Sequence, residues 1–206
     1  RRECSSWMFS LFYGLYELLF RKDIYHVLIL GVDRAGKTNV LERLKTLYTN
    51  LVGLDPGKIL PTVGLNVGRL EANNQPMVVW DLGGQTGLRS IWDKYYDESH
   101  AVIYVIDAAS RDRFDESRKA LQSVLDSHEL SGAPLLIMAN KQDIDGVADA
   151  QFITEQFRIG GVHSRPVKVV PVCAYTGQGF KESMDWLLQA IKTSPRVQQL
   201  KEKHSR

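Results

Sequence analysis

Cysteine is scarce in this 206-residue chain, which contains only Cys4 and Cys173. Two cysteines cannot supply a disulfide framework for a chain of this size, so we expect the protein to function in a reducing compartment. A long hydrophobic run is also missing. The most apolar stretch near the start, residues 7–20, contains Glu17 and is shorter than the roughly 20 residues that a membrane-spanning helix needs. The sequence therefore predicts no transmembrane helix.

No charge of one sign dominates the chain, because 26 basic and 24 acidic side chains leave a formal net charge of +2. The balance is uneven along the sequence: residues 23–191 hold 17 basic and 21 acidic side chains, and the positive excess lies at the two ends. A nucleic-acid-binding body would need a basic face. We therefore expect no nucleic acid partner, whereas the two ends are compatible with an anionic membrane surface.

Targeting signals are few. Arg1 and Arg2 precede the apolar stretch, as in a secretory signal peptide, but no cleavage site of small residues follows it. Phe9 rather than glycine follows Met8, and the last four residues do not form a CaaX box. We expect no secretion, no N-myristoylation and no prenylation.

Short apolar runs alternate regularly with amphipathic segments. Several runs are hydrophobic throughout, which is typical of strands buried on both faces of a mostly parallel sheet. The alternation predicts an α/β fold with a doubly wound, mostly parallel six-stranded sheet. The expected strands are Tyr25–Leu30, Val63–Leu70, Met77–Asp81, Ala101–Asp107, Leu135–Ala139 and Val167–Val172. The expected helices place on one face Leu41, Leu44, Leu47 and Tyr48, then Phe114, Leu121, Val124 and Leu125, and then Phe180, Met184, Leu187, Leu188 and Ile191.

A phosphate-binding loop (the P-loop, residues 31–38) directly follows the first expected strand and fits the pattern G-x-x-x-x-G-K-[ST]. Its glycines let backbone N–H groups close around phosphate oxygens, and the helix N-terminus that follows favours negative charge. Lys37 would reach the β- and γ-phosphates, and Thr38 would give its hydroxyl to magnesium. The predicted nucleotide-binding positions here are Gly31, Asp33, Arg34, Ala35, Gly36, Lys37, Thr38 and Asn39.

The end of the third expected strand carries further candidates for phosphate chemistry. Asp81 fits the carboxylate that holds the magnesium shell, although a simple cap on the following turn would use the same residue type. The Gly84 N–H is the expected donor to the γ-phosphate, because the pair Gly83-Gly84 lets the backbone approach closely. Gln85 is a neutral side chain able to orient water, which suits a reaction catalysed by positioning and electrostatics.

Two later loops predict recognition of a guanine base. Asp143 can accept two hydrogen bonds from guanine, whereas adenine offers no such pair. The stem of Lys141 could cover the base plane, and Asn140 could tie this loop to the P-loop. Residues Cys173 and Ala174 end the sixth expected strand, where their N–H groups would lie near the guanine O6. We interpret the Cys173 side chain as a small buried hydrophobe rather than a reactive thiol.

With these residues in place, the chain resembles a small GTPase and, more narrowly, the ADP-ribosylation factor (Arf) and Arf-like family, from Met8 to about Ile191. The resemblance implies a P-loop small GTPase G domain with an N-terminal amphipathic helix. It rests on the apolar N-terminal segment, G-x-D-x-A-G-K-T with Asp33, Pro61–Gly64, W-D-L-G-G-Q over Trp80–Gln85, Ile91–Tyr96 and N-K-Q-D over Asn140–Asp143.

The resemblance implies roles that the residues alone do not give. Thr62 would be the switch I threonine that binds magnesium and the γ-phosphate only in the GTP state. Gln85 would be the switch II glutamine that positions the attacking water. Arg34 points away from the phosphates by analogy, so slow intrinsic hydrolysis is expected. The implied ligands are GTP, GDP and Mg²⁺, and the implied partners of this monomer are a nucleotide exchange factor, a GTPase-activating protein and trafficking effectors.

Three features depart from an ordinary Arf. The segment from Lys37 to Thr62 is several residues longer, and Leu65 replaces an aromatic residue in the apolar triad with Trp80 and Tyr95. The absence of glycine after Met8 is the third. Together they are most similar to the ADP-ribosylation-factor-related protein branch. This branch implies action at the Golgi and trans-Golgi network, with the protein in the cytosol and peripherally on those membranes.

The two ends of the chain leave alternatives open. We expect residues 1–22 to form an extension and amphipathic helix, residues 23–192 the G domain, and residues 193–206 a basic tail. The N-terminal helix would either pack permanently on the core or insert into the membrane surface in the GTP form. For the tail, a solvated, frayed segment is favoured over a segment bound to anionic lipid.

Two other functions compete with the GTPase switch. One is a scaffold that holds GTP almost permanently, which Gln85 disfavours. The other is a P-loop kinase that uses ATP, which Asp143 disfavours.

Overall fold

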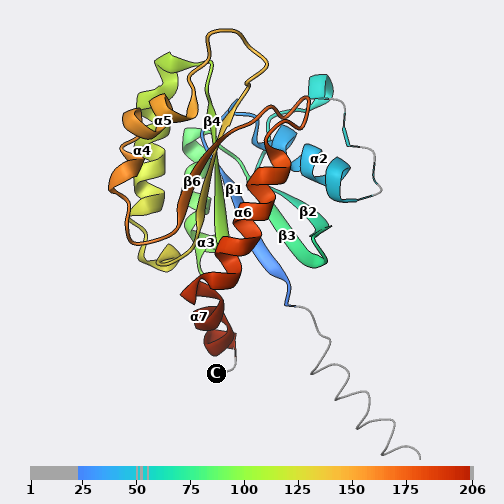
Figure 1. Cartoon of the computed structure of the whole chain (residues 1–206), viewed down its shortest axis with the longest axis vertical. Coiled ribbons are helices and arrows are strands. Elements are labelled where there is room, and N and C mark those ends of the chain that lie inside the picture. Colours follow the sequence, from blue (N-terminus) through green and yellow to red (C-terminus); the bar gives the residue numbers. More distant parts are fainter. Residues whose placement is uncertain (1–22, 50, 52, 55, 205–206) are drawn as a thin grey trace, which may run out of the picture.

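The computed structural model describes residues 23–49, 51, 53–54 and 56–204 (Figure 1). Six strands form one sheet in the order β2-β3-β1-β4-β5-β6, and among its neighbouring pairs only β2–β3 is antiparallel. The doubly wound, mostly parallel sheet is therefore confirmed. Its strands are β1 (Tyr25–Leu30), β2 (Leu65–Ala72), β3 (Gln75–Leu82), β4 (Ala101–Asp107), β5 (Leu135–Asn140) and β6 (Val167–Pro171).

Helices lie on both sides of the sheet, with α2 and α6 on one side and α4 and α5 on the other (Figure 1). The α-helices of the described residues are α2 (Lys37–Tyr48), α3 (Asp93–Tyr96), α4 (Phe114–Leu125), α5 (Ala150–Gln156), α6 (Phe180–Thr193) and α7 (Pro195–His204). The predicted N-terminal amphipathic helix in residues 1–22 lies outside the described residues.

The core follows the hydrophobic pattern of the central strands. Every residue of β4 is buried, as the continuous apolar run predicted for a strand covered on both faces. The apolar faces of α2 and α6 pack against the sheet, with Leu41, Leu44 and Phe180 fully buried. One expectation was wrong: Leu47 of α2 is 49% exposed, although Tyr48 in the same turn packs against the core.

The β2–β3 hairpin differs from its predicted bounds for two local reasons. Gly64 has φ +84°, a left-handed conformation that regular strands exclude, so β2 begins at Leu65 rather than at Val63. The hairpin turns at Asn73 and Asn74, both with positive φ, as in the two-residue turns that connect twisted strands. The strands therefore continue up to this turn. Three smaller differences are that β3 ends at Leu82, β5 at Asn140 and β6 at Pro171.

The C-terminal segment is not the frayed tail that we expected, because residues 195–204 form α7. Pro195 begins the helix, where its fixed φ is favourable, and the Ser194 hydroxyl accepts a hydrogen bond from the Arg196 N–H. The Arg196 side chain is buried and donates to the carbonyls of Tyr96 and Ser99 at 2.7 and 3.0 Å. These bonds attach α7 to the loop between α3 and β4.

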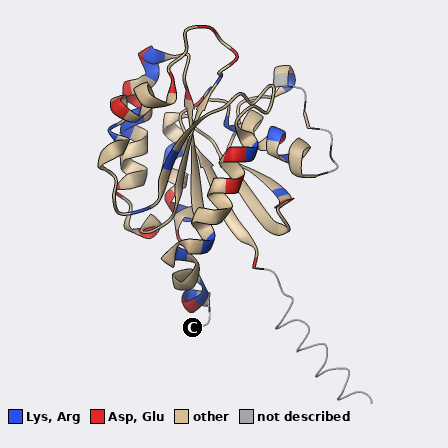
Figure 2. Ribbon diagram, in the orientation of Figure 1, with Lys and Arg blue, Asp and Glu red and all other residues tan. Residues whose placement is uncertain are grey.

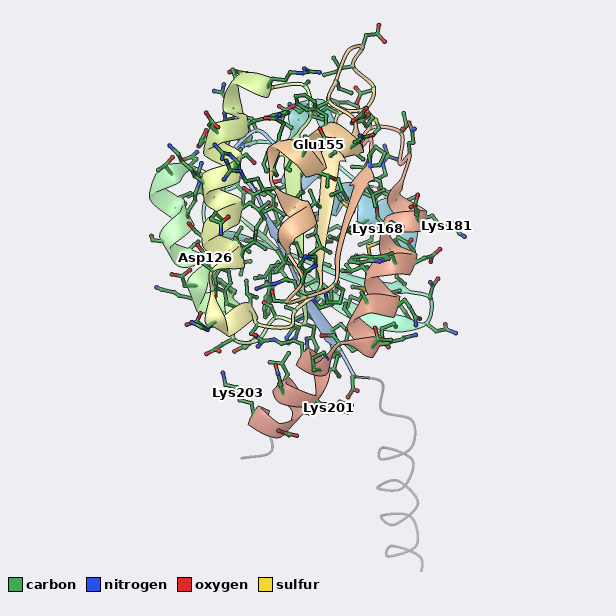
Figure 3. The ribbon with its side chains drawn as sticks, turned by 60° about the vertical axis from the view of Figure 1, so that its left-hand side comes forward. Asp126, Glu155, Lys168, Lys181, Lys201 and Lys203 are labelled. Atoms are coloured by element: carbon green, nitrogen blue, oxygen red, sulfur yellow. The ribbon has the colours of Figure 1, made fainter. Side chains whose placement is uncertain are left out.

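The N-terminal ends of the parallel strands and α7 share one end of the molecule, opposite the P-loop. Lys201 and Lys203, labelled in Figure 3, form ion pairs with Asp23 before β1 and Asp97 after α3. Basic and acidic residues are intermingled along the helices and loops (Figure 2). Within the described part of the chain, no helix is both long and apolar enough to span a bilayer.

Candidate functional site

The P-loop connects the end of β1 to the start of α2 in a conformation that needs its two glycines. Gly31 has φ +140° and Gly36 has φ +92°. A Cβ atom at Gly31 would lie 2.4 Å from the Val105 carbonyl oxygen of β4, which leaves room only for glycine.

The start of α2 leaves backbone N–H groups free for an anion. The first bond of the helix runs from the Val40 N–H to the Gly36 carbonyl, at 2.9 Å. The N–H groups of Lys37, Thr38 and Asn39 consequently have no partner within the helix, as at every helix N-terminus. Together with the helix dipole, they form the backbone part of a phosphate site.

Lys37 supplies the cation of this site. Its side chain is buried, and its Nζ donates to the Val32 carbonyl at 3.0 Å. Burial lowers the pKa of Lys37 to about 8, although the negative charges of Asp81 and Asp33 act in the opposite direction. An ammonium group this poorly solvated gains strongly from phosphate oxygens, which would replace its lost water.

Three oxygen-bearing side chains converge beside Lys37, as predicted. The Thr38 hydroxyl donates to Asp81 Oδ2 at 2.7 Å, and the Thr62 hydroxyl lies 2.7 Å from that of Thr38 and 3.2 Å from Asp81 Oδ2. Asp81 is fully buried, and its Oδ1 has no hydrogen-bond partner among the described residues. Burial raises the pKa of this carboxyl despite the hydrogen bond from Thr38 and the charge of Lys37.

This oxygen cluster fits a magnesium ion. Mg²⁺ takes oxygen ligands, keeps several waters and binds through one or two protein groups together with nucleotide phosphates. The unpaired Asp81 oxygen and the hydroxyls of Thr38 and Thr62 supply such a set. Within the described residues, no cluster of three or more His, Cys, Asp or Glu side chains offers an alternative metal site.

Gly84, in the segment that follows β3 (residues 83–89), lies directly against the P-loop. A Cβ atom at Gly84 would lie 2.3 Å from Lys37 Nζ and 2.5 Å from the Gly31 carbonyl oxygen, so only glycine fits there. The Gly84 carbonyl accepts a hydrogen bond from the Asp33 N–H at 3.1 Å. Gln85 follows as an exposed residue. The predicted close approach of this backbone to the phosphate site is therefore present.

Asn140 joins the two base-side loops to the P-loop, as its motif predicted. Its Nδ2 donates to the Ala35 carbonyl at 3.0 Å, and its Oδ1 accepts from the Ala174 N–H at 3.1 Å. All three residues are buried. A Cβ atom at Gly36 would lie 2.4 Å from this Nδ2, which shows how closely the amide packs on the P-loop.

The remaining base-side residues lie beside Asn140. Asp143 is exposed, and its Oδ1 accepts a hydrogen bond from the buried Cys173 thiol at 3.2 Å. Lys141 forms an ion pair with Asp107, with its Nζ 2.6 Å from Oδ2. We expected the N–H groups of Cys173 and Ala174 to lie near the guanine O6. Both are bonded within the protein instead, the Cys173 N–H to the Gln178 carbonyl and the Ala174 N–H to Asn140 Oδ1. For Cys173, the reason is the tight turn that follows β6.

The other predicted P-loop residues lie at the site with different exposure. The Arg34 side chain is 86% exposed, and its Nε lies 3.9 Å from Asp33 Oδ2. Asp33 instead bonds to Arg113. Asn39 is half-buried in the first turn of α2.

Several residues at the site gave no sequence signal. Arg43 of α2 donates to the carbonyls of Ala174 and Tyr175 and so holds the base-side loop. Arg89, Arg113 and Glu116 link residues 83–89, the P-loop and α4. Arginines and glutamates of these spacings occur on any solvated surface, so no local pattern distinguishes them.

Comparisons with known proteins agree with this geometry. The model of the ADP-ribosylation factor family matches residues 12–191. ADP-ribosylation factor-related protein 1 of Rattus norvegicus is 42% identical over 190 residues, covering 89% of this chain and 93% of that protein. ADP-ribosylation factor-like protein 3 of Saccharomyces cerevisiae is 40% identical over 188 residues, covering 90% and 94%.

One solved structure that shares this fold contains a bound nucleotide analogue. It is the Arl6 small GTPase of Trypanosoma brucei with the bound nucleotide analogue GppNp, with a TM-score of 0.73 and 27% identity over 82% of this chain and 98% of that one. This family binds GTP and GDP with Mg²⁺ and hydrolyses GTP, and the P-loop, the oxygen cluster and the base-side loops are the parts that such chemistry needs. The chain therefore belongs to the ADP-ribosylation factor family of small GTPases.

Proposed function

We propose that this GTP-binding switch regulates membrane trafficking at the Golgi and trans-Golgi network. In this proposal the GTP form associates peripherally with the membrane through the N-terminal segment and recruits effectors there, and the GDP form returns to the cytosol. The similarity to ADP-ribosylation factor-related protein 1 supports placing the chain in that branch.

One observation carries the switch mechanism: Thr62 and Gly84 come from different segments and converge on the P-loop. The Thr62 hydroxyl lies 2.7 Å from that of Thr38, and the position of a Gly84 Cβ lies 2.3 Å from Lys37 Nζ. A γ-phosphate beside Lys37 would contact both segments at once, whereas a diphosphate would contact neither. Thr62 and Gly84 are thus proposed to report the third phosphate.

The proposed roles of the site residues follow from their chemistry. Lys37 and the N–H groups at the start of α2 hold the phosphates, while Asn140 keeps the base-side loops in register with them. Bound Mg²⁺ would neutralise charge on the β- and γ-phosphates, held by Thr38 and Thr62 with Asp81 behind them. Asp143 selects guanine. The Gln85 amide is exposed toward solvent and would orient the attacking water.

Effector binding is proposed at the apolar residues around β2. Leu60 and Val63 are 81% and 82% exposed, and Val67 is 43% exposed. Exposed apolar side chains concentrated on one segment are typical of protein interaction sites. Because this segment contains Thr62, its conformation would depend on the nucleotide. Family members generally interact with exchange factors, GTPase-activating proteins and effectors, and we propose that this chain does so as a monomer.

Liposome flotation tests the membrane part of the proposal. We expect full-length protein loaded with a non-hydrolysable GTP analogue to float with liposomes, GDP-loaded protein to stay in solution, and deletion of residues 1–22 to abolish flotation. Equal flotation of both nucleotide forms would contradict a nucleotide-controlled association.

Imaging of tagged protein in cells tests the location. We expect Gln85→Leu, which slows hydrolysis, to accumulate on Golgi membranes, and Thr38→Asn, which removes a proposed magnesium ligand, to remain cytosolic. A Golgi signal that is the same for both variants would contradict the proposal.

A further inference from the structure

A closed ring of hydrogen bonds joins the P-loop, residues 83–89 and helix α4. The Gly84 carbonyl accepts from the Asp33 N–H at 3.1 Å and from Arg89 Nε at 2.8 Å. The Nη2 atom of Arg89 bonds to Glu116 Oε1. The other oxygen, Glu116 Oε2, accepts from Arg113 Nη2 at 2.9 Å. Arg113 closes the ring with bonds to Asp33 Oδ1 at 2.6 Å and to the Asp33 carbonyl at 2.7 Å. We name these five residues the Gly84 ring.

The ring fixes one of the two peptide planes beside Gly84. The Gly84 carbonyl belongs to the same planar peptide as the Gln85 N–H, so two donors on that oxygen set the direction of the N–H as well. The other plane is fixed by Trp92, whose buried Nε1 donates to the Gly83 carbonyl at 3.0 Å. The Gly84 N–H belongs to the same planar peptide as the Gly83 carbonyl, so its direction is fixed as well.

Glu116 is the counter-ion that two arginines share. The side chains of Arg89 and Arg113 are 17% and 26% exposed, and both lie close enough to Lys37 for their charges to lower its pKa. Hydrogen bonds from Arg89 and then Arg113 lower the pKa of Glu116, so the ring is ionised at neutral pH. Partly exposed ion pairs add little to stability. The consequence of this ring is geometric: it connects α4 to the backbone beside the γ-phosphate position.

We propose that Glu116 is a positioning residue for GTP hydrolysis and for the GTP state, which it supports through Arg89 and Arg113 by holding Gly84 and Gln85 over the P-loop. The inference rests on the proposed nucleotide site. In the proposed switch, a diphosphate would make no contact with Gly84. Loss of the ring therefore affects the triphosphate state selectively, because a switch responds only to differences between its two states.

The chain provides a matched control for Glu116. Asp115 is the adjacent residue of α4 and forms an ion pair of the same spacing with Arg118 at 2.7 Å. Its side chain is 80% exposed and lies outside the Gly84 ring. Asp115→Asn therefore removes one negative charge and one i,i+3 pair from the same helix turn without touching the ring.

The test compares full-length wild type, Glu116→Gln and Asp115→Asn for single-turnover GTP hydrolysis and for dissociation of fluorescent GDP and a non-hydrolysable GTP analogue. For Glu116→Gln we expect hydrolysis to fall about 10-fold and the GTP analogue to dissociate about 5-fold faster, as the loss of charge-assisted hydrogen bonds at a partly exposed site predicts. GDP dissociation should change less than about 2-fold, and Asp115→Asn should match wild type throughout.

Two further variants probe the ring from its other members. Arg113→Lys keeps the charge but loses the fork that reaches both Asp33 and Glu116, so it should reproduce the effect of Glu116→Gln. Arg89→Ala should lower the rate of GTP hydrolysis by a smaller factor in the Glu116→Gln variant than in the wild-type protein, because the two residues act through one ring.

The outcomes separate this inference from the proposed function. Equal acceleration of GDP and GTP-analogue release in Glu116→Gln would show a general structural role and overturn the inference, as would unchanged kinetics. Wild-type protein that bound ATP as tightly as GTP would instead overturn the assignment of the nucleotide site.

Discussion

Asn140→Ala tests how far the base-side loops and the P-loop act as one site. The Asn140 amide bonds to the Ala35 carbonyl at 3.0 Å and to the Ala174 N–H at 3.1 Å, and all three residues are buried. Truncation leaves both backbone groups without these partners. An unsatisfied buried group costs about 1–3 kcal/mol. The free protein can relieve this cost by letting the loops part and admit water, whereas a bound nucleotide holds them together, so nucleotide binding should weaken by about 2–4 kcal/mol. This corresponds to about 30- to 1,000-fold faster dissociation.

Dissociation of fluorescent GDP and of a GTP analogue measures this directly, and both should accelerate to a similar degree because Asn140 does not contact the third phosphate. The control is Gln142→Ala in the same loop, whose amide bonds to Ala139 and Ala148 without reaching the P-loop. Gly36→Ala should resemble Asn140→Ala, since its Cβ would lie 2.4 Å from the same Nδ2. A change of less than about 3-fold in Asn140→Ala would show that Asn140 does not couple the base-side loops to the P-loop, because the effect would fall below the cost of one buried hydrogen bond.

Two further predictions concern pH and stability. The pKa of Lys37 is about 8 in the folded chain, against an ordinary value of 10.5. Between these two pH values the unfolded chain binds more protons than the folded chain, so the free energy of unfolding of ligand-free protein should rise with pH. Phosphates favour the charged lysine, so GDP binding at about pH 8.5 should take up about three quarters of a proton. Calorimetry in buffers of different ionisation enthalpy measures this uptake, and a binding enthalpy that did not depend on the buffer would contradict it. Arg196→Ala removes two hydrogen bonds from the buried contact of α7 and should lower the free energy of unfolding, measured in urea, by about 2–4 kcal/mol. The control Lys203→Ala removes only an exposed ion pair with Asp97 and should lower it by less than about 1 kcal/mol. An equal effect of both substitutions would show that α7 is not attached through Arg196.

The phosphate and base loops could be predicted from the sequence because their geometry is local. Gly31 and Gly36 permit backbone conformations that other residues resist, and their spacing to Lys37 is fixed along the chain. The strands that are buried on both faces, such as β1 and β4, were predicted with correct bounds, because a continuous apolar run of this length is typical of a strand covered on both faces of a sheet.

The parts that escaped prediction depend on contacts between distant residues. The Gly84 ring joins residues 33, 89, 113 and 116, whose side chains look like ordinary surface charges in the sequence. Similarly, α7 has a polar sequence, and its attachment comes from Arg196 bonding to backbone carbonyls, which carry no sequence signature. The left-handed Gly64 moved the start of β2 from Val63 to Leu65, and the sequence does not show that this glycine has a positive φ.

The proposed switch requires Thr62 and Gly84 to report the third phosphate, and hydrogen exchange of full-length protein measures whether they do. We expect a non-hydrolysable GTP analogue to slow amide exchange in residues 61–66 and 83–89 relative to GDP, while residues 140–143 exchange equally in both forms. Equal exchange of residues 61–66 and 83–89 in the two nucleotide states would contradict it.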